Sequence, residues 1–218
     1  MRLEGHQTRV STRSLARMPA RRRFRGDDGT IIAESALLTP FFVLLLFGML
    51  EFGGAFRDYL TLSNAASTGA RTAAIEGNTA VADWNTILAI KEGASAMPMS
   101  QITRIVIYKA LTPTAGMPSG CATAGSAINH CNSYDKATIA TVTPSATMPL
   151  SWANCTGPTA GWCPTAVVSS GPRIVSAANP DYLGVWVQIV HPWITGLFGT
   201  SLTMTQTSII RLEPQTLT

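Results

Sequence analysis

The sequence predicts an α+β protein in which a single N-terminal transmembrane helix extends into a long amphipathic helix, with a small antiparallel β-sheet domain packed on it. Three observations support this prediction: an uncharged apolar run, an alanine-rich segment with helical spacing after it, and three later segments dense in β-branched residues. We therefore expect a basic cytoplasmic leader over residues 1–29, the long helix over 30–77 and an exported α+β domain over 78–218.

The leader holds the positive charge of the chain. Residues 1–29 carry eight arginines against three acidic side chains, whereas the remainder carries eight basic and nine acidic side chains. A nucleic-acid surface spreads its basic side chains over a folded face, so this arm does not predict nucleic-acid binding. Arginines directly before an apolar span instead place the N-terminus in the cytoplasm by the positive-inside rule.

The apolar run, residues 35–50, contains no charged residue. Flanking uncharged residues extend it to the roughly 20 residues that a helix needs to cross a bilayer. A cleaved secretory signal has an apolar region of only about 7 to 15 residues followed by a small-residue cleavage site, which is not the pattern here. We therefore expect Ile31, Pro40 and Phe52 to belong to a helix that contacts the lipid bilayer, where proline is tolerated.

Glu34 is the residue that a plain signal anchor leaves unexplained. A carboxylate within an apolar span costs on the order of 2.5 to 3.5 kcal/mol near the helix centre, and less at the edge. Such a group is usually retained for a partner. The natural partner is a free amine on a neighbouring chain.

The N-terminus resembles the signature of TadE-like minor pilins of tight-adherence (Flp, type IVb) pili over the segment RRRFRGDDGTIIAESALLTPFFVLLLFGMLEFGGAFRDYLTLSNAASTGARTAA. In type IV prepilins a basic leader ends in glycine, a membrane peptidase cuts after that glycine, and the fifth mature residue is glutamate. The resemblance places these features at Gly29, at the bond from Gly29 to Thr30 and at Glu34. Gly26 does not fit this spacing.

The resemblance continues beyond the cleavage site. The family pattern has a proline inside the helix and a Glu-Phe-Gly step at its end, matched here by Pro40 and by residues 51–53, and it extends through residues 69–71. The C-terminal IIRLEP, residues 209–214, resembles the way many of these chains end. Ser35 stands where the major type IVb pilin often has tyrosine, which favours a minor subunit.

The resemblance implies a structural and assembly function in a pilus, with no enzymatic activity and no cofactor. The implied partners are a prepilin peptidase, other pilin subunits, the inner-membrane pilus assembly platform and the lipid bilayer. Cleavage would expose an ammonium group at Thr30, which Glu34 of an adjacent subunit can neutralise inside lipid. The implied location is a single pass through the inner (cytoplasmic) membrane, with the C-terminal domain outside and incorporation into a surface pilus as a later step.

Beyond the span, small and apolar residues recur near helical spacing as far as Ala74, and Gly77 supplies a stop. A second helix is expected over residues 81–96, before Pro98. Segments rich in β-branched and aromatic residues predict strands over residues 102–110, 184–190 and 202–212.

The four cysteines lie in a region rich in Thr, Ala, Gly and Pro, about residues 111–180, which we expect to be a disulfide-stapled, exposed and variable loop. An even number in short-range pairs is typical of an oxidising compartment; the residues are Cys121, Cys131, Cys155 and Cys163. Bonds between neighbours would close two short loops, worth about 2 to 3 kcal/mol apiece. Four cysteines nevertheless allow three pairings.

No catalytic motif occurs with convincing spacing, and a zinc site built from His130 and the cysteines lacks a CxxC pair. Two alternatives stay open: an exported enzyme with an unfamiliar site, and an unprocessed signal-anchored extracytoplasmic binding protein. The second would use tryptophans for recognition, namely Trp152, Trp162, Trp186 and Trp193. The segment HPWITGLFG, residues 191–199, is expected to lie in the core of the domain, with contact to the membrane or to a neighbouring subunit as the alternatives.

Overall fold

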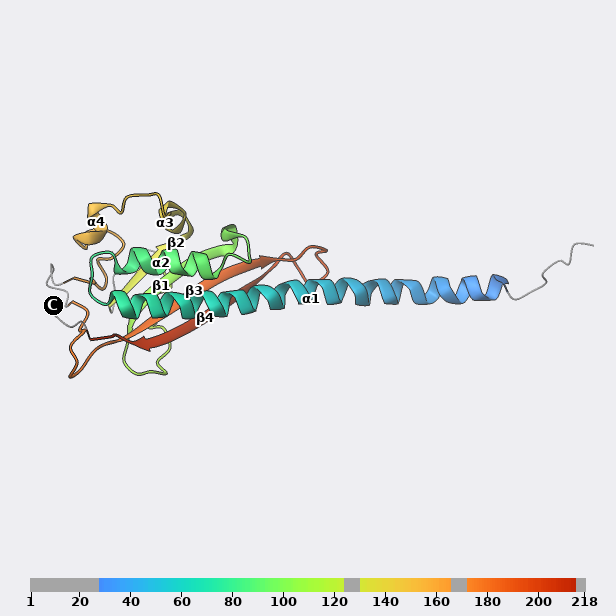
Figure 1. The fold of residues 1–218 in the computed structure, drawn as a ribbon. Helices are drawn as coiled ribbons and strands as arrows, with labels where there is room; N and C mark the ends of the chain where they lie inside the picture. Colours follow the sequence, from blue (N-terminus) through green and yellow to red (C-terminus); the bar gives the residue numbers. More distant parts are fainter. Residues whose placement is uncertain (1–27, 124–129, 166–171, 215–218) are drawn as a thin grey trace, which may run out of the picture. The chain divides into compact units, whose positions relative to one another are not determined.

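The structure is a computed structural model that describes residues 28–123, 130–165 and 172–214. Met1–Leu45 and Leu46–Thr218 form two compact units. Helix α1 (Asp28–Glu76) makes up the described part of the first unit and continues into the second. The later elements are α2 (Ala82–Gly93), η1 (Met99–Gln101), β1 (Ile102–Ala110), β2 (Cys131–Asp135), α3 (Lys136–Thr141), α4 (Leu150–Ala153), β3 (Tyr182–Pro192) and β4 (Ser201–Arg211) (Figure 1). The predicted α+β class is confirmed.

Helix α1 runs through Pro40 without a break and ends where the sequence predicts. Directly before the proline, the hydroxyl of Thr39 donates to the carbonyl of Ser35, one turn earlier, at 2.6 Å, so this hydroxyl is satisfied within the helix. Gly77 follows the last helical residue with a φ of 55°, and its amide donates to the carbonyl of Ala73 at 3.0 Å. This left-handed conformation is one that glycine adopts readily, and it is common at helix ends.

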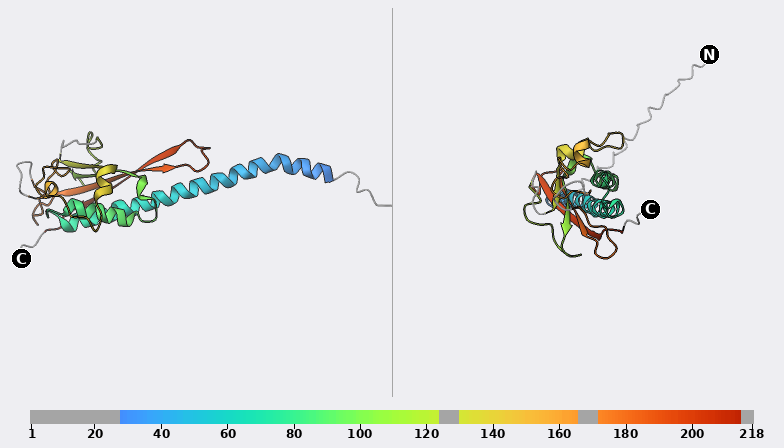
Figure 2. Two further views of the ribbon diagram at one scale, coloured as in Figure 1. Left: turned by 90° about the horizontal axis from the view of Figure 1, so that it is seen from above. Right: turned by 90° about the vertical axis from the view of Figure 1, so that its left-hand side faces the viewer.

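Helix α2 packs beside the C-terminal half of α1 (Figures 1 and 2). It is shorter than the predicted 81–96, because Ala94 caps it and turns follow. Small residues allow the close approach: a Cβ on Gly69 would overlap the side chain of Ile90, and one on Gly93 would press on the backbone of Ala65. The glycine at position 69 therefore has a packing role between the two helices.

The sheet has the order β2-β1-β3-β4, and every neighbouring pair is antiparallel. Strand β1 covers the predicted 102–110, β3 extends the predicted 184–190 by two residues at each end, and β4 lies one residue earlier than the predicted 202–212. The three predicted strands are thus confirmed. Strand β2 was not predicted, because its sequence CNSYD has no apolar alternation.

The two faces of the sheet belong to different apolar clusters. One face packs with α1 and α2 through alternating residues such as Ile105 and Ile107 of β1 and Val187 of β3. The other face contributes Val106 and Tyr108 to a smaller cluster that contains the first disulfide. The C-terminal half of α1 is therefore an integral part of the domain core.

The region 111–180 was predicted as loop, and this prediction was too simple, because its described part contains β2, α3 and α4. Disulfides join Cys121 to Cys131 and Cys155 to Cys163. The first bond attaches the segment after β1 to the start of β2. Side-chain capping of α3 by Asp135, which accepts from the amide of Thr138 at 2.9 Å, stabilises one of the short helices.

Candidate functional site

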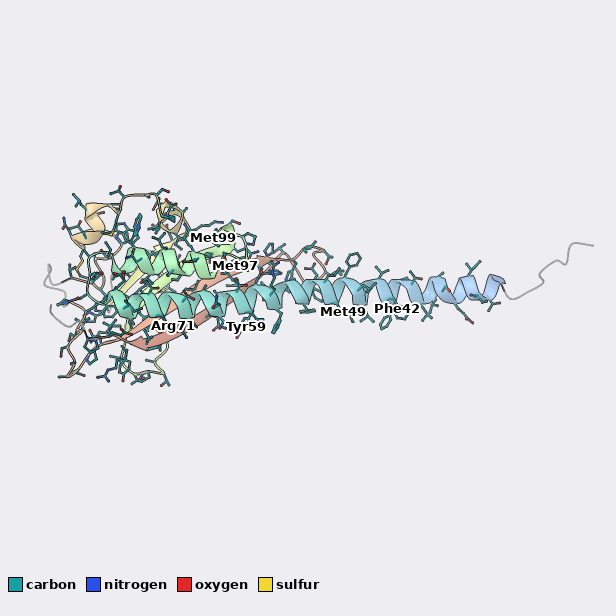
Figure 3. All side chains as sticks on the ribbon, viewed as in Figure 1. Phe42, Met49, Tyr59, Arg71, Met97 and Met99 are labelled. Carbon is teal, nitrogen blue, oxygen red and sulfur yellow. A yellow bond between two sulfur atoms is a disulfide. The ribbon has the colours of Figure 1, made fainter. Side chains whose placement is uncertain are left out.

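The amino-terminal part of α1 exposes nearly all of its side chains. Gly29, Thr30 and Glu34 lie in its first two turns, and their described surfaces are open. The large apolar side chains that follow are also exposed, including Phe42 and Met49 (Figure 3). Among the described residues, α1 is the one helix that is long and apolar enough to cross a membrane. A helix with this surface is suited to a lipid environment.

A loop between β3 and β4 contacts α1 just after the apolar run. We call residues 193–200 the β3–β4 loop. The carboxylate of Glu51, which is 1% exposed, accepts hydrogen bonds from the amides of Ile194 (3.0 Å) and Thr195, and from the Thr195 hydroxyl (2.7 Å). Hydrogen bonds to a carboxylate are stronger than those between neutral groups. Glu51 therefore fixes the loop to the helix.

Contacts between aromatic rings also hold the loop on α1, at Phe52, the residue after Glu51. The ring of Phe52 lies 5.9 Å from that of Trp193 and 4.9 Å from that of Phe198, measured between centroids. The rings of Trp193 and Phe198 are 5.7 Å apart. Such tilted and edge-on pairs add to the stabilisation that comes from burial alone.

The prediction that HPWITGLFG lies in the core is wrong for most of the segment. His191 is buried, but Ile194, Leu197 and Phe198 are 87%, 54% and 44% exposed. The alternating strand pattern ends at Pro192, and the loop beyond it rests on α1 through its backbone and through rings. Its aliphatic side chains therefore point outward.

A buried hydrogen bond between a histidine and an aspartate lies about two turns beyond Glu51 along α1. Nδ1 of His191 is 2.7 Å from Oδ2 of Asp58, and the other carboxylate oxygen is 3.1 Å from Nη2 of Arg57. Asp58 is 1% exposed, whereas the side chain of Arg57 is largely exposed. The two acids on this part of the helix, Glu51 and Asp58, are thus both covered by the end of the hairpin.

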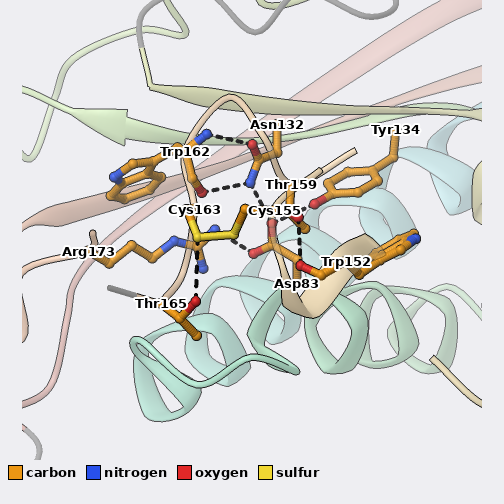
Figure 4. The surroundings of a disulfide bond; sticks show 10 residues. All are labelled: Asp83, Asn132, Tyr134, Trp152, Cys155, Thr159, Trp162, Cys163, Thr165 and Arg173. Atoms are coloured by element: carbon orange, nitrogen blue, oxygen red, sulfur yellow. Dashed lines mark hydrogen bonds and ion pairs between the residues drawn. A yellow bond between two sulfur atoms is a disulfide. The ribbon is translucent and has the colours of Figure 1, made fainter. Parts of the chain in front are cut away.

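A second buried network lies at the second disulfide (Figure 4). Asp83 accepts from Arg173 on one oxygen, and from the Nδ2 of Asn132 (2.7 Å) and the hydroxyl of Tyr134 on the other. The guanidinium also lies 4.6 Å above the ring of Trp162. Burial raises the pKa of Tyr134, and the negative charge of Asp83 raises it further. Through these buried contacts, the network connects α2, β2 and the disulfide-bonded segment.

Two of the four tryptophans that were considered for ligand recognition belong to this buried network or pack on it. Trp152 and Trp162 are core residues, packed on Tyr134 and under Arg173 respectively. The four cysteines are all disulfide-bonded, and no three of the described His, Cys, Asp and Glu residues are placed to hold a metal ion.

The contacts of Glu51, Asp58 and His191 were not foreseen from the sequence. In the sequence, Glu51 follows the apolar run and belongs to the family pattern. A signal was present, because buried acids need partners, and a second acid follows seven residues later on the same helix. The sequence alone does not indicate which distant loop supplies these partners.

Residues 29–71 match the TadE-like protein family, as the N-terminal resemblance predicted. The match begins at Gly29, includes Glu34 and the Glu51–Phe52 step, and ends two residues after the close helix contact at Gly69. No curated protein and no solved structure shows significant similarity to the chain.

Proposed function

We propose that the chain is a minor pilin-like structural and assembly subunit of a tight-adherence (type IVb) pilus, and that a prepilin peptidase processes it after Gly29. The observation that carries the proposal is the exposed apolar helix whose one carboxylate between Gly29 and Glu51 is Glu34, five residues after Gly29. The family match over the same helix supports it. This is a function in assembly and does not require a catalytic site.

The chemistry of the cleaved end gives Glu34 its role. Cleavage leaves an ammonium group at Thr30 and a carboxylate at Glu34 in an apolar helix, and each is costly to bury alone. When two subunits lie side by side, the carboxylate of one neutralises the ammonium of the next, so both costs fall together. Glu34 therefore makes lateral association more favourable than isolation in lipid.

The leader and the disulfides support the proposed orientation. Eight arginines before the apolar run hold the leader in the cytoplasm, so the sheet domain lies outside the inner membrane. An oxidising compartment on that side permits the two disulfides. Other pilin subunits and a membrane assembly platform are the partners that this location and function require.

The test is a pair of isosteric charge removals in the native cell. Glu34→Gln removes the carboxylate on the apolar helix, and Glu92→Gln removes an exposed carboxylate on α2. We expect Glu34→Gln to reach the membrane in normal amount but to reduce pili in the sheared surface fraction to the level of a deletion strain. Glu92→Gln should leave pili unchanged. Normal piliation with Glu34→Gln would refute the assembly role of this carboxylate.

A further inference from the structure

The β3–β4 loop lies at the level where α1 leaves the apolar run. A helix that enters lipid at Thr30 needs about 20 residues to cross the hydrocarbon core, which brings its outer end close to residue 50. Glu51 and Phe52, the two residues that hold the loop, follow directly. Both belong to the same compact unit as the loop, so the loop is held next to the outer boundary of the span.

The surface at this point is apolar and lacks exposed acids. Ile194, Leu197 and Phe198 are exposed on the loop, and Met49 and Leu50 are exposed on the adjoining turn of α1. No Asp, Glu, Lys or Arg occurs between positions 181 and 211. The acids of the nearby helix turns are buried, so the outward-facing charge there is the guanidinium of residue 57, which suits phosphate headgroups.

Several polar groups of the loop have hydrogen-bond partners within the protein, as an environment with little water requires. Two of its amides and one hydroxyl donate to the Glu51 carboxylate. Exposed loops at a membrane surface otherwise lose hydration of these groups at a cost. Trp193 and Phe198 flank this point, and aromatic rings favour the boundary between hydrocarbon and water.

We infer that residues 193–198 insert into the interfacial layer of the phospholipid bilayer that α1 spans, as a second membrane contact. The domain then contacts the bilayer at two places, the helix and the loop. Two contacts restrict the rotation of the domain about the helix axis. The inference requires that α1 crosses a bilayer. It requires neither cleavage after Gly29 nor pilus assembly.

Quenching of Trp193 by lipid tests the inference. The full chain is reconstituted at one copy per nanodisc in phosphatidylcholine and phosphatidylglycerol brominated in the upper acyl chain. Of the other four tryptophans, Trp84, Trp152 and Trp162 are buried and Trp186 is half-buried. Comparison with Trp193→Phe therefore isolates the signal of the loop. We expect strong quenching in the native chain and loss of most of it in Trp193→Phe.

Two double variants separate insertion from nonspecific effects. Ile194→Asp with Leu197→Asp should reduce quenching to the level of Trp193→Phe, while the chain stays in the disc through α1. Leu111→Asp with Leu150→Asp changes two strongly exposed leucines elsewhere in the domain and should leave quenching unchanged. Unfolding temperatures of both variants report whether the fold is retained.

The outcomes are distinct. Equal quenching of the native chain and Trp193→Phe would overturn the inference, as would quenching that survives the two loop aspartates. Protection of Trp193 that arises only when other pilin subunits are added would assign this surface to a protein contact and would also overturn it. The precursor and a chain that begins at Thr30 should give the same quenching, so failure of leader processing would leave this result intact.

Discussion

Removal of the Glu51 charge is the most informative single perturbation of the loop attachment. Its carboxylate accepts three hydrogen bonds from two loop residues. Glu51→Gln keeps the shape but replaces one acceptor oxygen with a donor, so at least one loop amide loses its partner. A hydrogen bond to a charged group contributes about 1.5 to 3 kcal/mol, and relief of the burial cost of the carboxylate offsets part of this loss.

We expect amide hydrogen exchange of Ile194 and Thr195 to accelerate by about tenfold to a hundredfold in Glu51→Gln, because exchange reports the free energy of local opening. The assay is exchange of the full chain in nanodiscs, read for the loop and for β1. Exchange in β1 should change little. Thr195→Val removes the hydroxyl bond to Glu51 and the longer bond that the Leu197 amide donates to this hydroxyl (3.3 Å), but it keeps both amide bonds to the carboxylate, so it should give a smaller acceleration.

Unchanged loop exchange in Glu51→Gln would refute the conclusion that this carboxylate holds the loop. Acceleration of β1 to the same extent would also contradict it, because the effect would then be global destabilisation. Loop exchange must also accelerate more in Glu51→Gln than in Thr195→Val.

Arg173→Met leaves the buried Asp83 without its cation and should lower the free energy of unfolding by about 3 to 5 kcal/mol in urea titrations of the full chain in detergent; a loss below about 1 kcal/mol would contradict the role of the pair. Gly69→Val places a branched side chain where α2 leaves no space and should cost about 1 to 3 kcal/mol in the same assay, so unchanged stability would count against the close helix contact. Hydrogen bonds from Thr138 lower the carboxyl pKa of Asp135 from 3.8, so the cap contributes stability above that value which is lost as the pH falls through the lower folded pKa. Asp135→Asn, which can still cap α3, should flatten this acid-side decline in melting temperature, and an unchanged decline would refute the assignment.

The parts of the fold that the sequence predicted are those with strong local signals. The apolar run and its small-residue continuation predicted α1, and Gly77 predicted its end, because periodicity and glycine chemistry act locally. Strand β1 was predicted to the residue from its dense β-branched composition. The positions of the processing residues Gly29 and Thr30 stay predictions that chemistry in the cell must test.

The parts that could not be predicted depend on contacts between distant segments. Strand β2 is short and polar, and it pairs with β1 in a register that runs from Cys131 to Asp135. The exposed β3–β4 loop resembled a core segment because its composition is apolar, and composition does not distinguish burial in protein from contact with lipid. The partners of Asp83 come from β2, through Asn132 and Tyr134, and from the segment that contains Arg173, which no local pattern encodes.

The central claim, processing as a prepilin, is tested most directly by mass mapping of the N-terminus of the membrane-extracted chain, from cells with their prepilin peptidase and from cells without it. The account predicts Thr30 as a new terminus that appears only when the peptidase is present. An intact arm from Met1 to Gly29 in both strains would contradict the account and would leave an unprocessed, signal-anchored extracytoplasmic protein.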